Sequence, residues 1–129
     1  MLKCYIAGPM TGIPDFNHRA FHEAAARWRE AGWEVVNPVE LDDTTHKSRW
    51  FYMRQDVKAL MDCDAIAMLS GWEQSAGAAA EQAVAIACGI PVFDAAHPGT
   101  YVTHPFVDGY NACCAKPKYN HESHWMDLS

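Results

Sequence analysis

A carboxylate stands inside an alanine-rich stretch of the chain, WEQSAGAAAEQAVAIACGIPVF, at residues 72–93. Between Ser75 and Gly89, Glu81 and Gln82 are the only residues that are neither small nor apolar. A glutamate beside a ligand can act as a nucleophile or as a general acid or base. The same glutamate also fits the solvated face of a helix, so periodicity alone leaves both interpretations open.

The residues around Glu81 predict a helix with a polar N-terminus. Ser75 is a favourable N-cap, and Gly89 occupies the position at which a glycine commonly ends a helix. Gly77 lies four residues before Glu81 and therefore faces the same way. Free backbone amides at a helix N-terminus attract anions such as phosphate. We therefore predict that Ser75 and Gly77 contact a ligand.

A glycine-containing loop, GPMTG, follows the first apolar run. Gly8 and Gly12 would let the backbone approach a ligand closely, although both also fit an ordinary turn. The motif matches neither the dinucleotide-binding fingerprint nor the P-loop of nucleoside triphosphatases. We predict that Gly8, Met10, Thr11 and Gly12 line a binding site.

Tyr5 and Asp56 are two further polar side chains inside predicted elements. Tyr5 lies in the C-terminal half of the first apolar run, where a buried core aromatic would also fit. Asp56 has Arg54 and Lys58 nearby on the same predicted helix, which is also typical of an exposed helix charge. Residue type and spacing therefore do not decide whether Tyr5 and Asp56 have a role at a functional site or only these structural roles.

Short apolar runs alternate with helical patterns over residues 1–95. We predict strands at Leu2–Ala7, Trp33–Asn37, Asp64–Leu69 and Pro91–Phe93, with Val39–Ser48 as a loop. We predict a first helix from Asp15, as its cap, to Gly32, and a third from Ser75 to Gly89. A second helix is predicted over Arg49–Met61. One face of this second helix should carry its apolar residues, Trp50, Met53, Val57, Leu60 and Met61.

This alternation predicts a flavodoxin-like or Rossmann-like α/β sandwich of three layers, with a mostly parallel sheet of four to five strands. Ligands in such folds bind beyond the carboxyl ends of the strands. The GPMTG loop and the segment before Glu81 both belong at that edge.

The chain has 129 residues, which fits a single domain, with residues 1–95 as its core. We expect residues 96–129 to form a C-terminal extension that packs on a neighbouring subunit of a homodimer or larger homo-oligomer. A formal net charge of −6 argues against binding to DNA or RNA polymers. No apolar run is long enough to span a membrane, and we expect no membrane partner.

Five cysteines form no even framework, and no signal peptide is recognised. Cys4, Cys63 and Cys88 lie in apolar segments and should pack as small hydrophobic residues. These features predict a cytoplasmic protein.

No cofactor or metal is predicted. Four potential ligands near the C-terminus, Cys113, Cys114, His121 and His124, match no zinc spacing.

Three segments in order resemble one family: YIAGPMTG, then NPVEL, then YMRQDVKALMDCDAIAMLSGWEQSAGAAAEQAVAIACGIPVF. They are similar to the nucleoside 2-deoxyribosyltransferase superfamily, and closest to its short phage and bacterial branch of unassigned function. The similarity covers about three quarters of the chain. It implies a flavodoxin-like fold and catalysis through a glutamate on the third helix.

The resemblance implies that Glu81 attacks the anomeric carbon of a nucleoside and forms a covalent glycosyl-enzyme. A second base or water then resolves that intermediate, giving transfer or hydrolysis. Tyr5 would hold Glu81 in place, and Asp56 would contact the base and help to protonate it.

Within the superfamily, the position six residues before the glutamate discriminates between substrates. Transferases that act on free nucleosides have an aspartate there, whereas the nucleoside 5′-monophosphate N-glycosidases have a serine. This chain has Ser75, which favours a 5′-monophosphate. The alternative is a non-catalytic nucleotide-binding or interaction protein, for which Trp50, Phe51 and Trp72 would supply an aromatic surface.

Overall fold

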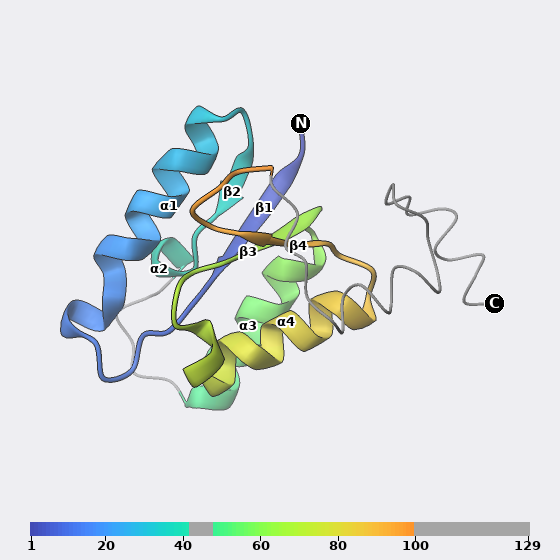
Figure 1. Ribbon diagram of the computed structural model, residues 1–129. Coiled ribbons are helices and arrows are strands. Elements are labelled where there is room, and N and C mark those ends of the chain that lie inside the picture. The colour runs from blue at the N-terminus through green and yellow to red at the C-terminus, as the bar shows by residue number, and fades with distance from the viewer. Residues whose placement is uncertain (42–47, 100–129) are drawn as a thin grey trace.

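A four-stranded parallel sheet lies between two layers of helices (Figure 1). The computed structural model describes residues 1–41 and 48–99. The strands are β1 (Lys3–Ala7), β2 (Glu34–Val36), β3 (Ala65–Met68) and β4 (Val92–Asp94), in the order β2-β1-β3-β4. The helices are η1 (Pro14–Asn17), α1 (His18–Glu30), α2 (Pro38–Leu41), α3 (Arg49–Met61), η2 (Trp72–Gln74) and α4 (Ala76–Ala87). The predicted flavodoxin-like α/β fold is confirmed.

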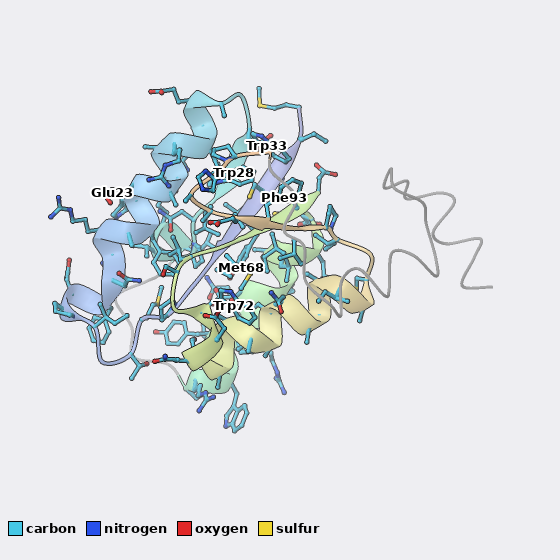
Figure 2. The ribbon with its side chains drawn as sticks, viewed as in Figure 1. Glu23, Trp28, Trp33, Met68, Trp72 and Phe93 are labelled. Carbon is cyan, nitrogen blue, oxygen red and sulfur yellow. The ribbon has the colours of Figure 1, made fainter. Side chains whose placement is uncertain are left out.

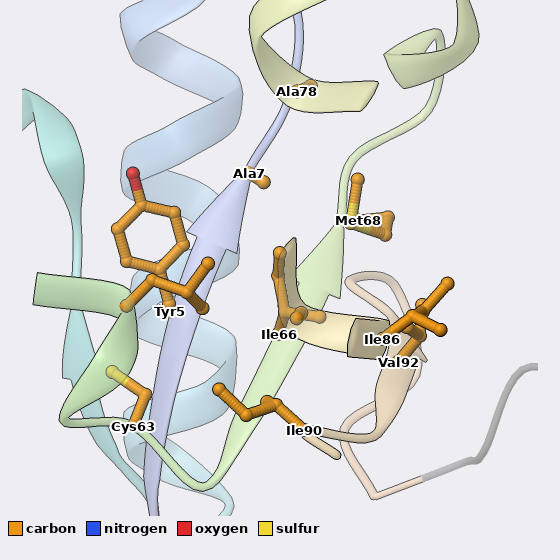
Figure 3. Close-up of a cluster of buried hydrophobic side chains, with 11 residues drawn as sticks. Tyr5, Ala7, Cys63, Ile66, Met68, Ala78, Ile86, Ile90 and Val92 are labelled. Carbon is orange, nitrogen blue, oxygen red and sulfur yellow. The ribbon is translucent and has the colours of Figure 1, made fainter. Parts of the chain in front are cut away.

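Alternation along the two central strands separates two cores. Tyr5 of β1 pairs with Ile66 of β3, which pairs with Val92 of β4, and all three belong to the core on the α3 and α4 side (Figure 3). Cys4 and Ile6 point to the opposite side, toward α1. Because side chains alternate across a strand, β1 sends Tyr5 toward α4 and its two neighbours toward α1.

Three aromatic rings close the core on the α1 side. Trp28, Trp33 and Phe93 pack edge to face, and the centroids of Trp28 and Trp33 are 4.9 Å apart (Figure 2). The indole N–H of Trp28 donates a 2.8 Å hydrogen bond to the carbonyl of Ala95. Trp28 therefore joins α1 to the segment that follows β4.

The approach to α1 differs from the predicted one. Asp15 is not the helix cap: Asp15, Phe16 and Asn17 all have positive φ, and the α-helix begins at His18. Asn17 takes the N-cap position, but its amide donates to the carbonyl of Pro9 at 2.9 Å instead of capping the helix. The left-handed turn is tied to the β1 loop by this bond.

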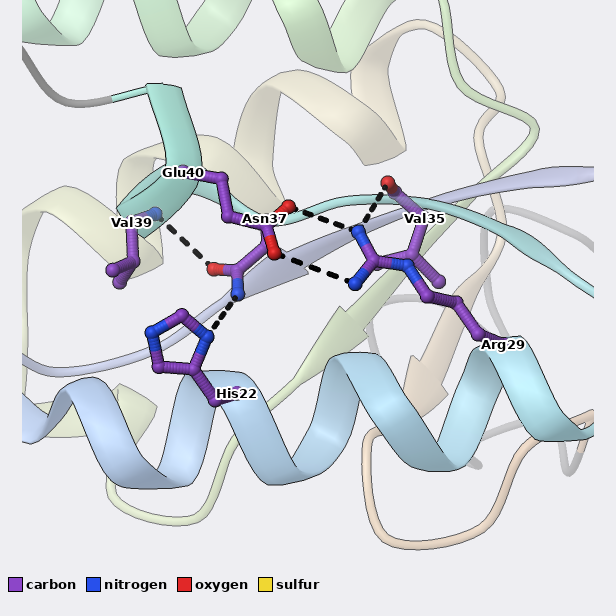
Figure 4. A network of polar contacts seen from close by, with 6 residues as sticks. All are labelled: His22, Arg29, Val35, Asn37, Val39 and Glu40. Carbon is purple, nitrogen blue, oxygen red and sulfur yellow. Dashed lines mark hydrogen bonds and ion pairs between the residues drawn. The ribbon is translucent and has the colours of Figure 1, made fainter.

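A short helix, α2, replaces the beginning of the predicted loop at Val39–Ser48. Pro38 is its first residue, which suits the fixed φ of proline, and Asn37 Oδ1 accepts the Val39 N–H at 3.1 Å. Arg29 of α1 holds α2 through a 2.9 Å ion pair with Glu40 (Figure 4). Residues 42–47 of the predicted loop lie outside the described part.

The predicted apolar face of α3 is only partly correct. Leu60 is buried and Met53 and Val57 are half-buried, but Trp50 is 72% exposed and Met61 39% exposed. The reason is that α3 packs against α4 and contributes Leu60 to the core with the strands, whereas the side chains of Trp50 and Met61 lie outside these contacts. Phe51, which the spacing left off this face, is exposed.

Cys4 and Cys63 are buried and Cys88 is half-buried, and all three are free thiols, as predicted for small packed residues. Burial raises the pKa of the Cys63 thiol to about 12.

Within residues 1–41 and 48–99, none of the helices has the length and apolar character needed to cross a bilayer.

Candidate active site

A buried hydrogen bond joins β1 to α4. The Tyr5 hydroxyl donates to Glu81 Oε2 at 2.7 Å, with Tyr5 fully buried and Glu81 only 6% exposed. The interpretation of Glu81 as a solvated helix charge is therefore wrong. Tyr5 is both a core aromatic and a hydrogen-bond donor, so its two interpretations hold together.

The small residues of α4 make this contact possible. The buried face of the helix consists of Ala78, Glu81, Gln82, Ala85 and Ile86. Alanines one turn before and after Glu81 leave no bulk between the helix axis and the sheet. Side chains on a helix point back toward its N-terminus, which here lies at the carboxyl edge of the strands. The Glu81 carboxylate is thus held at the edge where ligands of α/β folds bind.

Only one carboxylate oxygen of Glu81 is engaged. Oε2 accepts the Tyr5 hydroxyl, whereas no residue in the described ranges hydrogen-bonds Oε1. In those same ranges, no buried side-chain oxygen or nitrogen lacks a hydrogen-bond partner. Oε1 therefore keeps contact with solvent.

Burial raises the pKa of Glu81 to about 7. The Tyr5 hydrogen bond opposes this rise, and the negative charge of Asp56 adds to it. The pKa of Tyr5 is raised well above 10, first by burial and then by the charges of Glu81 and Asp56. Tyr5 therefore remains a protonated donor while Glu81 changes its charge near neutral pH.

Asp56 lies half-buried on α3, close enough for its charge to act on both Tyr5 and Glu81. The structure thus brings together the three residues that were predicted to be catalytic. Two carboxylates at one site can divide the roles of nucleophile and acid between them.

Ser75 and Gly77 lie at the N-terminus of α4, as predicted. The Ser75 hydroxyl oxygen accepts the Ala78 N–H at 3.1 Å, which makes it the N-cap and leaves its proton available to donate. A Cβ at Gly77 would meet only ordinary contacts, at 3.5 Å from Met53 Cε. Packing among the described residues therefore does not require a glycine at position 77.

Gly8 and Gly12, in the loop that follows β1, are favoured as glycines for different structural reasons. A Cβ on Gly8 would come within 2.6 Å of Leu69 Cβ, so close packing on the loop after β3 requires this glycine. Gly12 has a φ of 83°, which favours glycine, and its position is open. Thr11 is exposed, whereas Met10 packs partly against the core on the α1 side.

Sequence reasoning missed the burial of two side chains at this edge. Gln82 is 7% exposed, and Trp72 is half-buried against the core that contains Tyr5, so Trp72 does not belong to an exposed aromatic surface. The signal for Gln82 was its position between Ala78 and Ile86, each one turn away on a face that packs.

Residues 1–41 and 48–99 contain no group of three or more histidine, cysteine, aspartate or glutamate side chains that could hold a metal ion. The C-terminal candidates, Cys113, Cys114, His121 and His124, lie outside the described residues.

Residues 2–94 match the family described as "Domain of unknown function (DUF4406)". The chain belongs to this DUF4406 family. A comparison with curated proteins found no match.

Two solved structures share the fold of this DUF4406 chain. A conserved protein from Enterococcus faecalis V583 has a TM-score of 0.57 and 26% sequence identity, over 71% of this chain and 61% of that one. The chain thus spans less than two thirds of that protein's length. The 2-deoxyribosyltransferase of the psychrotolerant bacterium Bacillus psychrosaccharolyticus has a TM-score of 0.56 and 23% identity, over 78% of this chain and 77% of that one. The predicted resemblance is confirmed for the fold.

Proposed function

We propose that this protein cleaves or exchanges the N-glycosidic bond of a nucleoside or nucleoside 5′-monophosphate, with Glu81 as the nucleophile. The observation that carries the proposal is the buried Tyr5–Glu81 hydrogen bond at the carboxyl edge of the sheet. It orients one oxygen of the carboxylate and leaves the other available. The fold shared with a 2-deoxyribosyltransferase supports the same class of substrate.

In the first step, Glu81 Oε1 forms a bond to C1′ as the bond from C1′ to the base nitrogen breaks. The electron pair of that bond leaves with the base, and Asp56 in its acid form donates a proton to it. Positive charge develops on the sugar in the transition state, and the buried carboxylate stabilises it electrostatically.

In the second step, water or a second base attacks C1′ and releases Glu81 as a carboxylate. Asp56, now ionised, takes the proton that the attacking group loses. Water gives hydrolysis, and a second base gives exchange. Tyr5 remains a donor to Oε2 through both steps, which keeps the carboxylate in one orientation.

Ser75 supports a 5′-monophosphate as substrate. Its hydroxyl and the first free amides of α4 offer donors to an anion, and the positive end of the helix dipole favours negative charge there. A homo-oligomer in which residues 96–129 pack on a neighbouring subunit stays a prediction.

The direct test is a panel of nucleosides and 5′-monophosphates, with free base measured by chromatography. Wild-type protein should release base from at least one of them, while Glu81→Ala and Glu81→Gln should lose activity by roughly a thousandfold or more. Equal release by the variants would exclude Glu81 as the nucleophile. No release from any compound would favour the non-catalytic nucleotide-binding alternative.

Adding a second free base separates the two reactions. A new nucleoside indicates exchange, and loss of base alone indicates hydrolysis. Mass spectrometry of the acid-quenched protein should show a sugar adduct on the peptide that contains Glu81, because the mechanism requires that covalent intermediate.

A further inference from the structure

The amide of Gln82 is buried beside the nucleophile without a partner in the described residues. Gln82 is only 7% exposed, and no hydrogen bond joins its side chain to any residue of 1–41 or 48–99. Burying an unpaired amide is unfavourable, so a buried side chain of this kind usually has a bonding partner. Since the described residues contain no fully buried unpaired side-chain oxygen or nitrogen, the Gln82 amide reaches solvent.

Gln82 shares the buried face of α4 with Glu81. Ala78 and Ile86, one turn before and after it, both belong to the core on the α3 and α4 side of the sheet, so Gln82 leaves the helix on the sheet side. Its side chain points back toward the helix N-terminus, where Ser75 and the carboxyl edge of the sheet lie. Glu81 leaves the same turn toward Tyr5 of β1. The two side chains therefore leave the helix within one turn, both on its buried face.

We propose that Gln82 is a specificity-determining residue that hydrogen-bonds a sugar hydroxyl of the substrate, at C2′ or C3′. This inference rests on the proposed function. In a natural β-nucleoside the base is on one face of the sugar ring, and the 2′ and 3′ hydroxyls are on the other. A nucleophile that displaces the base approaches C1′ from the face that carries these hydroxyls. A hydrogen-bonding group beside the nucleophile therefore meets them.

An amide suits this role because it can both donate to and accept from a hydroxyl. A site that is built to bind a hydroxyl rejects the analogue without it, since the buried amide then stays unpaired. Gln82 would thus select the sugar, while Ser75 selects the group at C5′.

The test compares wild type, Gln82→Leu and Gln82→Met on four substrates with one base: the ribonucleoside and its 2′-deoxy, 3′-deoxy and 2′,3′-dideoxy analogues. The measured quantity is the ratio of kcat/KM for the substrate with a given hydroxyl to that for the analogue without it, and comparing this ratio between proteins cancels the intrinsic reactivity of each glycosidic bond. For the contacted hydroxyl, the ratio should be about tenfold higher in wild type than in either variant. Both variants should lose this discrimination while they still act on the analogue. Discrimination that persists in both variants would overturn the proposal.

A binding measurement keeps the result independent of base release. Calorimetry with ribose 5-phosphate and its 2-deoxy and 3-deoxy analogues should show about tenfold weaker binding of one analogue to wild type, and no difference for Gln82→Leu. If wild type releases no base but shows this pattern, the enzymatic proposal fails and the role of Gln82 stands. If wild type binds the sugars equally or not at all, the role of Gln82 fails.

Thermal unfolding excludes a purely structural role. Gln82→Leu and Gln82→Met should unfold within a few degrees of wild type, because each replaces a buried amide that lacks a described partner. A large fall in Tm for both would mean that the amide has a structural partner, and would overturn the proposal.

Discussion

The Tyr5 hydroxyl and the Glu81 carboxylate, 76 residues apart in the chain, are joined by a buried hydrogen bond of 2.7 Å. The bond links the central strand β1 to α4 across the core. It orients an ionisable group whose pKa burial has raised to about 7. The burial of the Glu81 carboxylate therefore sets its pKa, and the effects of this pKa on stability and activity can be measured.

Stability should depend on the charge of Glu81. Its pKa is about 7 in the folded chain and about 4.5 when unfolded, so the folded state binds the extra proton. This contribution to stability is fully present below pH 4.5 and is lost as pH rises through 7. Glu81→Gln should therefore match wild type at acidic pH and exceed it above pH 7 by about 3 kcal/mol. Urea unfolding of both proteins at several pH values measures the difference; a constant difference would contradict the raised pKa.

Activity should need the ionised form of Glu81. The value of kcat/KM for base release should rise with pH as Glu81 ionises, with the midpoint of the rise near pH 7. Tyr5→Phe removes the bond that lowers the pKa of Glu81, so the rise should move to higher pH. Asp56→Asn removes a negative charge that raises it, so the rise should move to lower pH even though the maximum rate falls. Shifts of both variants in the same direction would argue against this electrostatic arrangement.

Gly8 and Gly77 should respond differently to alanine. Gly8→Ala places a methyl group 2.6 Å from Leu69 Cβ and should destabilise the fold by about 1–3 kcal/mol. The methyl group of Gly77→Ala meets only ordinary contacts, so the free energy of unfolding should be unchanged or increase by up to about 1 kcal/mol. If the α4 N-terminus binds substrate, Gly77→Ala should raise KM without loss of stability. Denaturant unfolding and steady-state kinetics on both variants separate these effects.

Ser75 has a capping role and a proposed binding role, and two substitutions separate them. Ser75→Ala removes the cap on Ala78 N–H and should cost about 1 kcal/mol of stability. Ser75→Asp keeps a good N-cap but repels phosphate, so it should retain stability and shift the preference from monophosphate toward free nucleoside. The ratio of kcat/KM for the two substrates is the measurement, and an unchanged ratio would show that Ser75 does not select the 5′ group.

The alternation of apolar runs and helical patterns in the sequence is enough to predict the architecture. Strands of buried residues and helices with clear stops, such as Gly32 and Gly89, are local properties, and both glycines have the positive φ expected of a helix stop. The cap at Ser75 was equally local. The entry to α1 and the face of α3 were predicted less well, because they depend on bonds to the β1 loop and on packing against α4.

The sequence could not decide between a solvated and a buried Glu81, since a helical wheel shows only which residues share a side. Tertiary structure decided it, because α4 lies over Tyr5 with its alanines against the sheet. That placement shields most of the carboxylate from water, raises its pKa and supplies one hydrogen-bond donor. It also buries Gln82 beside it. Burial depends on which neighbouring elements cover a face, and those elements are far away in the chain.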